Sequence, residues 1–348
     1  MKRRDERGNM IEIDGSYLEG GGQIVRTAIA LSGITRKPVH IYNIRAGREK
    51  PGLRPQHLVG IEAAVRMSNG RAEGVHLGST DIMFIPGEIR GGEYFIDTRT
   101  AGAITLILQT LVPIGIYADS PSQFEIKGGT AVPFSPSIEY FQHILCYFLK
   151  MMGISVYTDI KRHGFYPAGG GRIFVKLEPG KIKDINLIQR GELQKIDVLS
   201  VASHHLEGAR VAERMLDGFK RVLPEANTKF QYVDALSQGC FIGSHAHFED
   251  GKLGADALGK KRKRAEDVGE GAALELKSAV GSNAPIDPWM VDQIIPYLAL
   301  AAYETGKKVK IRIPELTRHA KTNIWVAKNL LPVDFGVREN LLECWIGE

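Results

Sequence analysis

The order of predicted helices and strands repeats along this chain, and the repetition restricts its fold more than any other feature. Residues 10–90 predict strand, helix, strand, helix and then further strand material. Residues 92–179 and 281–348 return to the same order, with apolar residues at helical spacing and short β-branched strands. Three βαβαββ units therefore predict an α+β fold, in which each unit forms a sheet with helices on one face.

The third unit is interrupted. Its expected first strand, from Ile185, is separated from its first helix, from Pro285, by about a hundred residues, the length of a small domain. This stretch has strands and helices of its own. We therefore predict a small inserted α/β domain at residues 184–280, and a repeat domain made of residues 1–183 and 281–348.

Composition indicates a well-packed soluble protein, with 43% hydrophobic and 24% charged residues. Three distant cysteines, Cys146, Cys240 and Cys344, argue against a zinc site or a disulfide framework and fit a reducing compartment. No apolar run reaches membrane-spanning length, and the N-terminus MKRRDERGNM lacks the apolar region of an export signal. We expect a cytoplasmic location and no membrane partner.

A glycine-rich turn between a strand and a helix forms the first candidate site. Three consecutive glycines precede the helix, so backbone amides at its N-terminus can approach an anion closely. Glu19, beside these glycines, offers oxygen ligands suited to Mg²⁺ held against phosphates. Arg26 follows two turns along the helix. The alternative is a glycine-rich helix start with a solvated glutamate.

The second candidate is the basic segment 43–57, in which Arg45, Arg48, Lys50 and Arg54 fall within ten residues. The planar guanidinium suits phosphate oxygens, so several arginines together indicate a polyanionic ligand. The net charge of +5 is compatible with such a ligand but is only a mild bias. A solvated basic loop is the alternative, which the stiffening prolines of this segment disfavour.

Three further segments predict local structure or a binding function. RHGFYPAGGG, from Arg162, predicts a tight hairpin with a bulge. IDPWMVDQI predicts a helix start with Asp287 as its cap, where Trp289, Asp292 and Gln293 could hold a nucleobase. A core tryptophan at a helix start is the alternative. The basic run KKRKR within the insertion predicts a solvated loop or a phosphate contact.

His319 lies between a strand at 309–313 and an amphipathic helix expected to begin near Thr322. This position predicts an exposed loop, where a side chain is accessible. A neutral imidazole is available near pH 7 and can act as a base, a metal ligand or a nucleophile. The alternative is a surface histidine near a helix start.

Together, these segments resemble the RNA 3′-terminal phosphate cyclase family. The matching motifs are EGGGQIVR, IRAGREKPGLRPQH, AGAITLILQT, RHGFYPAGGG and HAKTN, which span almost the whole chain in the family's order. The resemblance implies three βαβαββ repeats with a smaller domain inserted in the third, in agreement with the repeats counted above.

The resemblance also implies an activity. His319 would attack the α-phosphate of ATP to form a histidyl–AMP, and AMP would pass to an RNA 3′-phosphate. The neighbouring 2′-hydroxyl would then displace AMP and leave a 2′,3′-cyclic phosphate, a step that depends mainly on positioning. The implied cofactors are ATP and a divalent cation, Mg²⁺ or Mn²⁺. The implied partner is RNA with a 3′-phosphate end, and chains of this size can form homodimers.

Further roles carry over from the family's motifs. Glu19 matches the metal-binding glutamate, and Arg26, Arg45 and Arg48 match arginines that hold the phosphates. Pro136 and Trp289 resemble the pair that encloses adenine. The remaining matches line the same site and comprise Gln56, Gln109, Asp292 and Gln293.

Three other functions were weighed. A non-catalytic ribosome-assembly relative shares the fold but lacks the histidine that is present here. Enolpyruvyl transferases have similar repeated units but use no histidyl–nucleotide and lack these motifs. An adenylyltransferase that acts on other nucleic-acid ends is compatible with the sequence.

Overall fold

The computed structural model describes residues 10–347, so most of the N-terminal stretch in which no export signal was predicted lies outside the described residues. Twelve of the described strands belong to the repeated units: β1 (Ile11–Asp14), β2 (Val39–Tyr42), β3 (Arg71–Glu73), β4 (Ile82–Ile85), β5 (Gly92–Asp97), β6 (Ser122–Gly128), β7 (Val156–Arg162), β8 (Gly171–Leu177), β9 (Asn186–Leu187), β14 (Val309–Arg312), β15 (Val333–Arg338) and β16 (Leu341–Ile346). Their helices are α1 (Gly22–Thr35), α2 (Pro55–Met67), α3 (Ile104–Ile116), α4 (Ile138–Tyr140), the π-helix η1 (Phe141–Leu145), α5 (Cys146–Met151), α8 (Pro288–Thr305) and α9 (Arg318–Leu330).

The three repeated units share one sheet topology. Their strand orders are β1-β2-β4-β3, β5-β6-β8-β7 and β9-β14-β16-β15. In each sheet the first two strands along the chain are parallel and the remaining neighbours are antiparallel. The α+β class and the threefold repetition predicted from the sequence are therefore confirmed.

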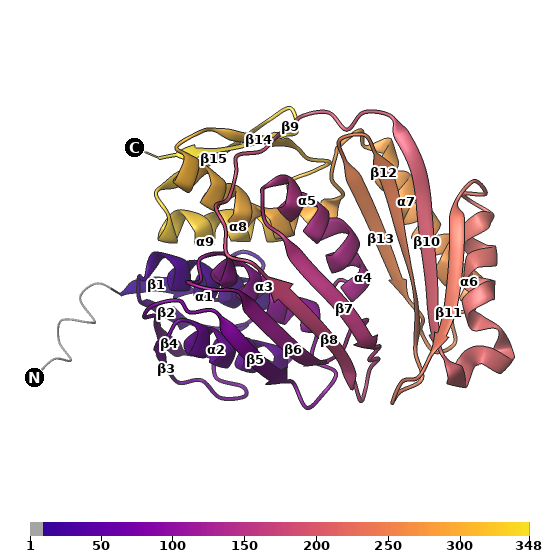
Figure 1. Ribbon diagram of the computed structural model, residues 1–348, viewed down its shortest axis with the longest axis horizontal. Helices are drawn as coiled ribbons and strands as arrows, with labels where there is room; N and C mark the ends of the chain where they lie inside the picture. The colour runs from indigo at the N-terminus through magenta and orange to yellow at the C-terminus, as the bar shows by residue number, and fades with distance from the viewer. Residues whose placement is uncertain (1–9, 348) are drawn as a thin grey trace, which may run out of the picture.

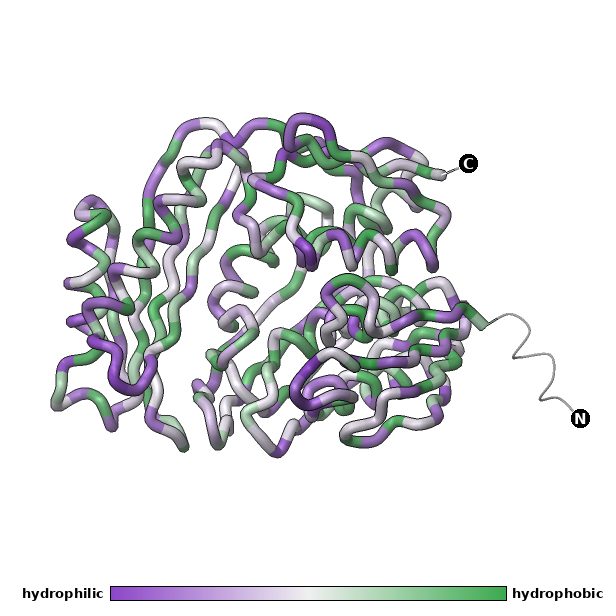
Figure 2. The backbone as a smooth tube through the Cα atoms, turned by 180° about the vertical axis from the view of Figure 1, so that it is seen from behind, coloured by the Kyte–Doolittle hydropathy of each residue, from purple (hydrophilic) through white to green (hydrophobic). Residues whose placement is uncertain are grey.

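The helices of the repeats pack against one another and form most of a shared core (Figure 1). All thirteen residues of α3 except Gln109 are buried, which explains its almost unbroken apolar sequence. Helices α1 and α9 lie side by side although they come from opposite ends of the chain, and the hydroxyl of Thr27 donates to Asn323 Oδ1 (2.7 Å) between them. The chain ends therefore contribute to one structural centre, and Figure 2 shows apolar segments meeting there.

The stretch between β9 and α8 forms a fourth sheet with its own core. Its elements are β10 (Leu193–Ser203), the 3₁₀-helix η2 (His204–Ala209), α6 (Val211–Lys220), β11 (Asn227–Val233), β12 (Cys240–Phe248), β13 (Lys252–Leu258) and α7 (Ala265–Gly281). The strand order is β11-β10-β12-β13, and α6 and α7 cover one face of the sheet (Figure 1). Met215, Phe219 and Leu276 are fully buried within this separate cluster. The division of the chain at residues 184 and 280 stays a prediction.

One boundary predicted from the sequence is wrong. Helix α9 begins at Arg318, so His319 lies in the first helical turn and not on a loop before it. The Thr317 hydroxyl accepts a hydrogen bond from Ala320 N (2.9 Å), and this cap starts the helix four residues before the expected position. By contrast, Asp287 caps α8 as predicted, accepting from Met290 N (2.9 Å).

The RHGFYPAGGG segment connects β7 to β8, and the pairing of these strands is irregular between Ile160 and Arg162. The predicted hairpin and its irregular register are therefore confirmed, but its loop, residues 163–170, is longer than the tight turn that was expected. No helix within residues 10–347 has the length and apolar character needed to cross a membrane.

Candidate active site

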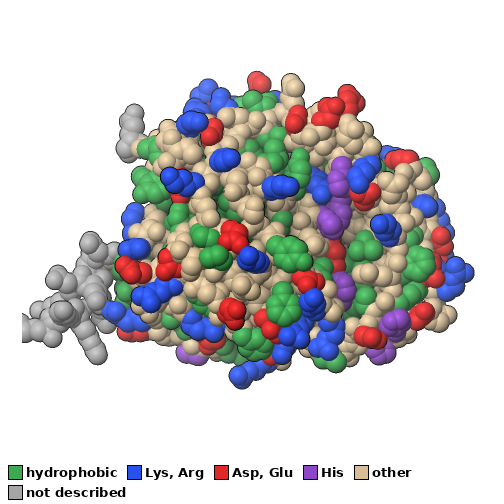
Figure 3. Space-filling model, in the orientation of Figure 1, with side chains coloured by type: hydrophobic (Ala, Val, Ile, Leu, Met, Phe, Trp, Pro, Cys, Tyr) green, Lys and Arg blue, Asp and Glu red, His purple; other side chains and the backbone are tan. Residues whose placement is uncertain are grey.

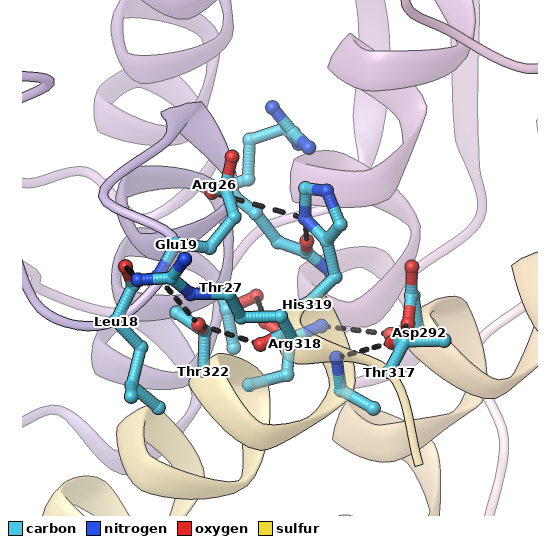
Figure 4. Close-up of polar contacts among 12 residues, drawn as sticks. Leu18, Glu19, Arg26, Thr27, Asp292, Thr317, Arg318, His319 and Thr322 are labelled. Atoms are coloured by element: carbon cyan, nitrogen blue, oxygen red, sulfur yellow. Dashed lines mark hydrogen bonds and ion pairs between the residues drawn. The ribbon is translucent and has the colours of Figure 1, made fainter. Parts of the chain in front are cut away.

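His319 is held at the centre of the candidate site by contacts from another repeat (Figure 4). Its Nδ1 lies 2.8 Å from Gln23 Oε1, and the imidazole is 44% exposed. An amide oxygen can only accept, so Nδ1 carries the proton and Nε2 keeps its lone pair. Partial burial, assisted by the nearby Arg26 and Arg48 cations, lowers the pKa of His319 below its usual value. The side chain is therefore a neutral imidazole with a free nitrogen.

Glu19 lies directly beside this histidine, with its Oε2 3.7 Å from His319 Nδ1. The carboxylate is almost fully buried, at 8% exposure, and forms an ion pair with Arg48. Its Oε2 has no hydrogen-bond partner among the described residues. The turn that carries Glu19 is fixed to α9, since Leu18 O accepts from Arg318 (2.6 Å) and Thr322 Oγ1 accepts from Glu19 N (3.3 Å).

Arg26 begins a chain of polar contacts that crosses all three repeats. Its Nε donates to Gln109 Oε1 on α3 (3.0 Å), and Gln109 Nε2 donates to Gln293 Oε1 on α8 (3.1 Å). Burial lowers the pKa of the Arg26 guanidinium to about 10, so it remains a cation at neutral pH. Residues from three distant segments are therefore joined in one polar chain that contains the Arg26 cation.

Arg45 and Arg48 take different positions in the basic loop. Arg45 has φ +54° and donates from Nη1 to the carbonyls of Lys50 (2.7 Å) and Gly52 (2.8 Å), which folds the loop back on itself. Arg48 reaches across to Glu19. Gln56 is half-buried as the second residue of α2.

His57 belongs to the site but was given no role in the sequence analysis. Its ring is buried, and Nδ1 accepts from Arg54 N (3.1 Å), so Nε2 carries the proton. Burial, and then the Arg26, Arg45 and Arg54 cations, hold the pKa of His57 well below its usual range. His57 is thus a neutral donor beside the N-terminus of α1. Its place at the end of the basic segment was the only sequence signal for it.

The predicted nucleobase residues occupy the start of α8 and the loop before α4. The Trp289 ring is 55% exposed, and its Nε1 donates to Glu275 Oε1 (2.6 Å). Pro136 O accepts from Thr105 Oγ1 (2.9 Å). Tyr140, four residues after Pro136, donates to Asp287 Oδ1 (2.7 Å), two residues before Trp289. This buried hydrogen bond fixes one segment relative to the other.

Asp292 is hydrogen-bonded to α9, the helix that carries His319, and to its cap. Its Oδ1 accepts from the Thr317 hydroxyl, and its backbone carbonyl accepts from Asn323 Nδ2 (2.7 Å), so both bonds reach α9 or its cap (Figure 4). Burial raises the pKa of the Asp292 carboxyl to about 7. Asp292 is therefore linked to His319 through the helix cap.

The structure gathers most of the predicted site residues into one polar network and leaves a few outside it. The residues joined by direct contacts or through α9 are Glu19, Arg26, Arg48, Gln109, Asp292, Gln293 and His319. The basic run at 260–264 is an exposed turn before α7. Residues 10–347 contain no group of three or more histidines, cysteines or acidic residues placed to hold a metal.

A neutral histidine at a helix N-terminus, near the Arg26 and Arg48 cations and a buried carboxylate on a threefold α+β repeat, defines an enzyme site for anionic substrates. Residues 17–337 match the RNA 3′-terminal phosphate cyclase family. Proteins named RNA 3′-terminal phosphate cyclase are similar over most of their length. That of Pyrococcus furiosus is 43% identical, covering 94% of this chain and 95% of its own, and that of Methanosarcina acetivorans is 39% identical, covering 95% and 97%. The chain belongs to the RNA 3′-terminal phosphate cyclase family.

Among solved structures, the enolpyruvyl transferase NikO from Streptomyces tendae aligns with 97% of this chain and 48% of its own length. The TM-score is 0.44 and the sequence identity is 10%.

Proposed function

We propose that this chain uses ATP to convert the 3′-terminal phosphate of RNA into a 2′,3′-cyclic phosphate, with His319 as the nucleophile. The observation that carries the proposal is the state of His319: a neutral imidazole, oriented through Nδ1 by Gln23, with Nε2 left free. A nucleophile of this kind needs no separate base to remove a proton before it attacks.

The reaction divides into three phosphoryl-group displacements. Nε2 of His319 attacks the α-phosphorus of ATP, the bond to the β-phosphate oxygen breaks, and pyrophosphate leaves. An oxygen of the RNA 3′-phosphate then attacks the same phosphorus, and the electron pair of the P–N bond returns to the imidazole. Finally the RNA 2′-hydroxyl attacks its neighbouring phosphate, loses its proton, and AMP leaves.

The charges around His319 suit this chemistry. Arg26, Arg45 and Arg48 supply positive charge for phosphate oxygens, and the amides at the start of α1 supply donors. His57 adds a neutral Nε2–H donor in the same region. Because Arg26 is buried and hydrogen-bonded to Gln109, its position is fixed before the substrate binds. This preorganisation lowers the activation free energy of the reaction.

The adenosine would bind at the start of α8. The exposed Trp289 ring offers a stacking surface, and Pro136 lies on the loop joined to it through Tyr140 and Asp287. Gln56, Gln109 and Gln293 would line the nucleotide, with Asp292 beside the nucleoside.

A divalent cation fits the observed donors. Glu19 Oε2 is buried without a hydrogen-bond partner, which is a costly state for a carboxylate oxygen unless a ligand completes it. Mg²⁺ often takes one carboxylate and completes its shell with phosphates and water. Glu19 would hold the ion, and the ion would neutralise charge on the ATP phosphates. A homodimer stays a further prediction for this chain.

Covalent labelling tests the proposal. Purified protein is incubated with α-³²P-ATP and Mg²⁺ and resolved on a denaturing gel. Wild type should give an acid-labile, alkali-stable band that RNA with a 3′-phosphate discharges. His319→Ala should abolish the band, and His205→Ala, which removes an exposed histidine of η2, should not. Undiminished label in His319→Ala would exclude His319 as the nucleophile.

A further inference from the structure

An open groove of about 700 Å³ lies on the other side of the Glu19 turn from His319. One wall is the turn itself, through Tyr17 and Leu18. The opposite walls come from α9, through Lys321, Trp325 and Lys328, and from β15 around Phe335. The groove therefore combines aromatic and aliphatic surface with two lysines.

The aromatic part of the groove is already ordered. The Tyr17 and Trp325 rings are stacked, with centroids 4.2 Å apart and an interplanar angle of 24°. Tyr17 and Leu18 are each 39% exposed, which is high for large apolar side chains. Exposed aromatic surface of this kind offers stacking positions to unpaired bases, whatever their sequence.

The charge of the groove favours a polyanion. Lys321 is exposed and has no carboxylate partner within residues 10–347, so its charge is available. Lys328 Nζ is paired with Asp334 (2.6 Å) and contributes less. A protein partner or a second copy of the chain would bind mainly through the apolar wall of the groove. Such a partner would not explain the unpaired charge of Lys321.

The groove shares the turn before Glu19 and helix α9 with the candidate active site. The residue after Leu18 is Glu19, whose carboxylate lies beside His319, and the Leu18 side chain turns away from the histidine (Figure 4). Lys321 lies on the groove side of α9, the helix that also carries His319. A chain with its end at His319 therefore needs to cross only this turn to enter the groove.

We propose that this groove binds the unpaired nucleotides that precede the 3′-phosphate of the RNA substrate. Their bases stack against the Tyr17–Trp325 pair, and a backbone phosphate lies near Lys321. The inference rests on the proposed function, because it names where the body of the same substrate binds.

Fluorescence anisotropy with a 5′-labelled single-stranded RNA bearing a 3′-phosphate, measured without ATP, tests the groove directly. Trp325→Ala should weaken binding about tenfold, by the loss of a stacking surface. Lys321→Glu should weaken binding and make it less dependent on salt, since fewer counterions are released. Both variants should form the covalent adenylate from ATP at the wild-type rate. Trp325→Phe keeps a ring and should retain most of the affinity, which separates stacking from a general loss of packing.

Two results would overturn the inference. One is wild-type RNA affinity in both Trp325→Ala and Lys321→Glu. The other is unchanged RNA affinity together with a shift from dimer to monomer in light scattering, which would assign the groove to a second copy of the chain. Absence of adenylate label in the wild-type protein would count against the proposed function, while the anisotropy result would still decide whether the groove binds RNA.

Discussion

At the scale of single residues, two glycines make room for the polar groups of the site. A Cβ at Gly21 would lie 2.0 Å from Glu19 Oε2, and one at Gly22 would lie 2.1 Å from His57 Nε2. Gly21 has φ −106°, so it is required for space and not for its backbone conformation. The glycines that predicted an anion site from the sequence therefore also leave the space that the Glu19 and His57 side chains occupy.

Gly21→Ala should displace the Glu19 carboxylate without unfolding the protein, because a side-chain end can move where backbone cannot. We expect adenylate formation to slow about tenfold or more at low Mg²⁺ and to recover partly at high Mg²⁺, as for loss of a metal ligand. The measurement is the labelling rate against Mg²⁺ concentration. Gly47→Ala is the matched control, since its Cβ would meet nothing within 4 Å. Equal Mg²⁺ dependence in wild type and Gly21→Ala would contradict a metal role for Glu19.

The environment of His319 gives a prediction about pH. Burial and the Arg26 and Arg48 cations lower its pKa below 6.5, so the neutral nucleophile persists into mildly acidic solution. The rate of single-turnover adenylylation should therefore fall only below pH 6.5. Arg48→Gln removes one of the cations, so its acid limb should move to higher pH than that of wild type, even though its maximal rate is lower. A limb at the same pH in both proteins would exclude the electrostatic contribution of Arg48.

The sequence identified most residues of the site by chemical type, but it could not give their protonation states. The free Nε2 of His319 depends on Gln23, and the neutral form of His57 depends first on its burial and then on three nearby arginines. Gln23 and His319 are 296 positions apart, and Arg26 comes from a different helix than His57, so no local pattern encodes these contacts. The same limit explains why His57 received no role.

At the scale of secondary-structure elements, the start of α9 decides where His319 lies. The Thr317 hydroxyl caps the helix and also donates to Asp292 on α8, so one side chain fixes both the helix end and its neighbour. The sequence analysis placed this helix start too late because polar residues such as Arg318 and Lys321 mask the apolar periodicity in the first turn. In contrast, Asp287 followed by Pro288 gave a recognisable start for α8.

Thr317→Ala should lower the free energy of unfolding by about 1 kcal/mol, the usual effect of losing a helix cap. It should also slow adenylate formation, because the first turn carries the nucleophile. Urea denaturation and the labelling rate measure the two effects. Thr317→Ser keeps the hydroxyl and should restore both. If Thr317→Ala loses stability but keeps the wild-type labelling rate, the cap does not position His319.

At the scale of the whole molecule, the RHGFYPAGGG hairpin joins the second repeat to the fourth sheet. Ala168 N donates to Ser237 Oγ (3.0 Å), and a Cβ at Gly239 would meet the Phe165 ring at 2.3 Å. Figure 3 shows histidine side chains gathered near this junction. The His143 ring of η1 and the His245 ring of β12 meet across it, with centroids 4.6 Å apart. The spacing of apolar residues predicted the repeats. It could not predict this junction, because the junction depends on contacts between two separately folded units and not on the sequence pattern within either one.

Buried ionisable groups make the junction sensitive to pH. Glu139 is 2% exposed, neither carboxyl oxygen has a hydrogen-bond partner among the described residues, and His163 Nε2 lies 3.5 Å away. Burial raises the pKa of Glu139 to about 8 and lowers the pKa of His163 to about 4, so the fold favours the neutral form of both groups at pH 7.

These shifts predict how stability depends on pH. From the ordinary Glu pKa of 4.5 up to about 8, folded Glu139 holds a proton that the unfolded chain releases, so its contribution to stability falls as pH rises through that window. Glu139→Gln cannot ionise. Relative to wild type, it should therefore gain free energy of unfolding as pH rises from 6 to about 8, by on the order of 1 kcal/mol for each pH unit. His163 is neutral throughout this range, and comparison of the two proteins cancels the other titrating groups.

Urea denaturation at several pH values provides the measurement, with Glu225→Gln, an exposed glutamate, as the matched control. The control should follow the wild-type curve at every pH. If Glu139→Gln also follows it, Glu139 is ionised in the folded protein, and a cation such as protonated His163 must then compensate it. A curve for Glu139→Gln that diverges upward with pH would establish that a neutral carboxyl lies between the second repeat and the fourth sheet. The contribution of this junction to the free energy of unfolding would then fall under alkaline conditions. The pH dependence of adenylylation at His319 would be separate, because it is set by the pKa of His319.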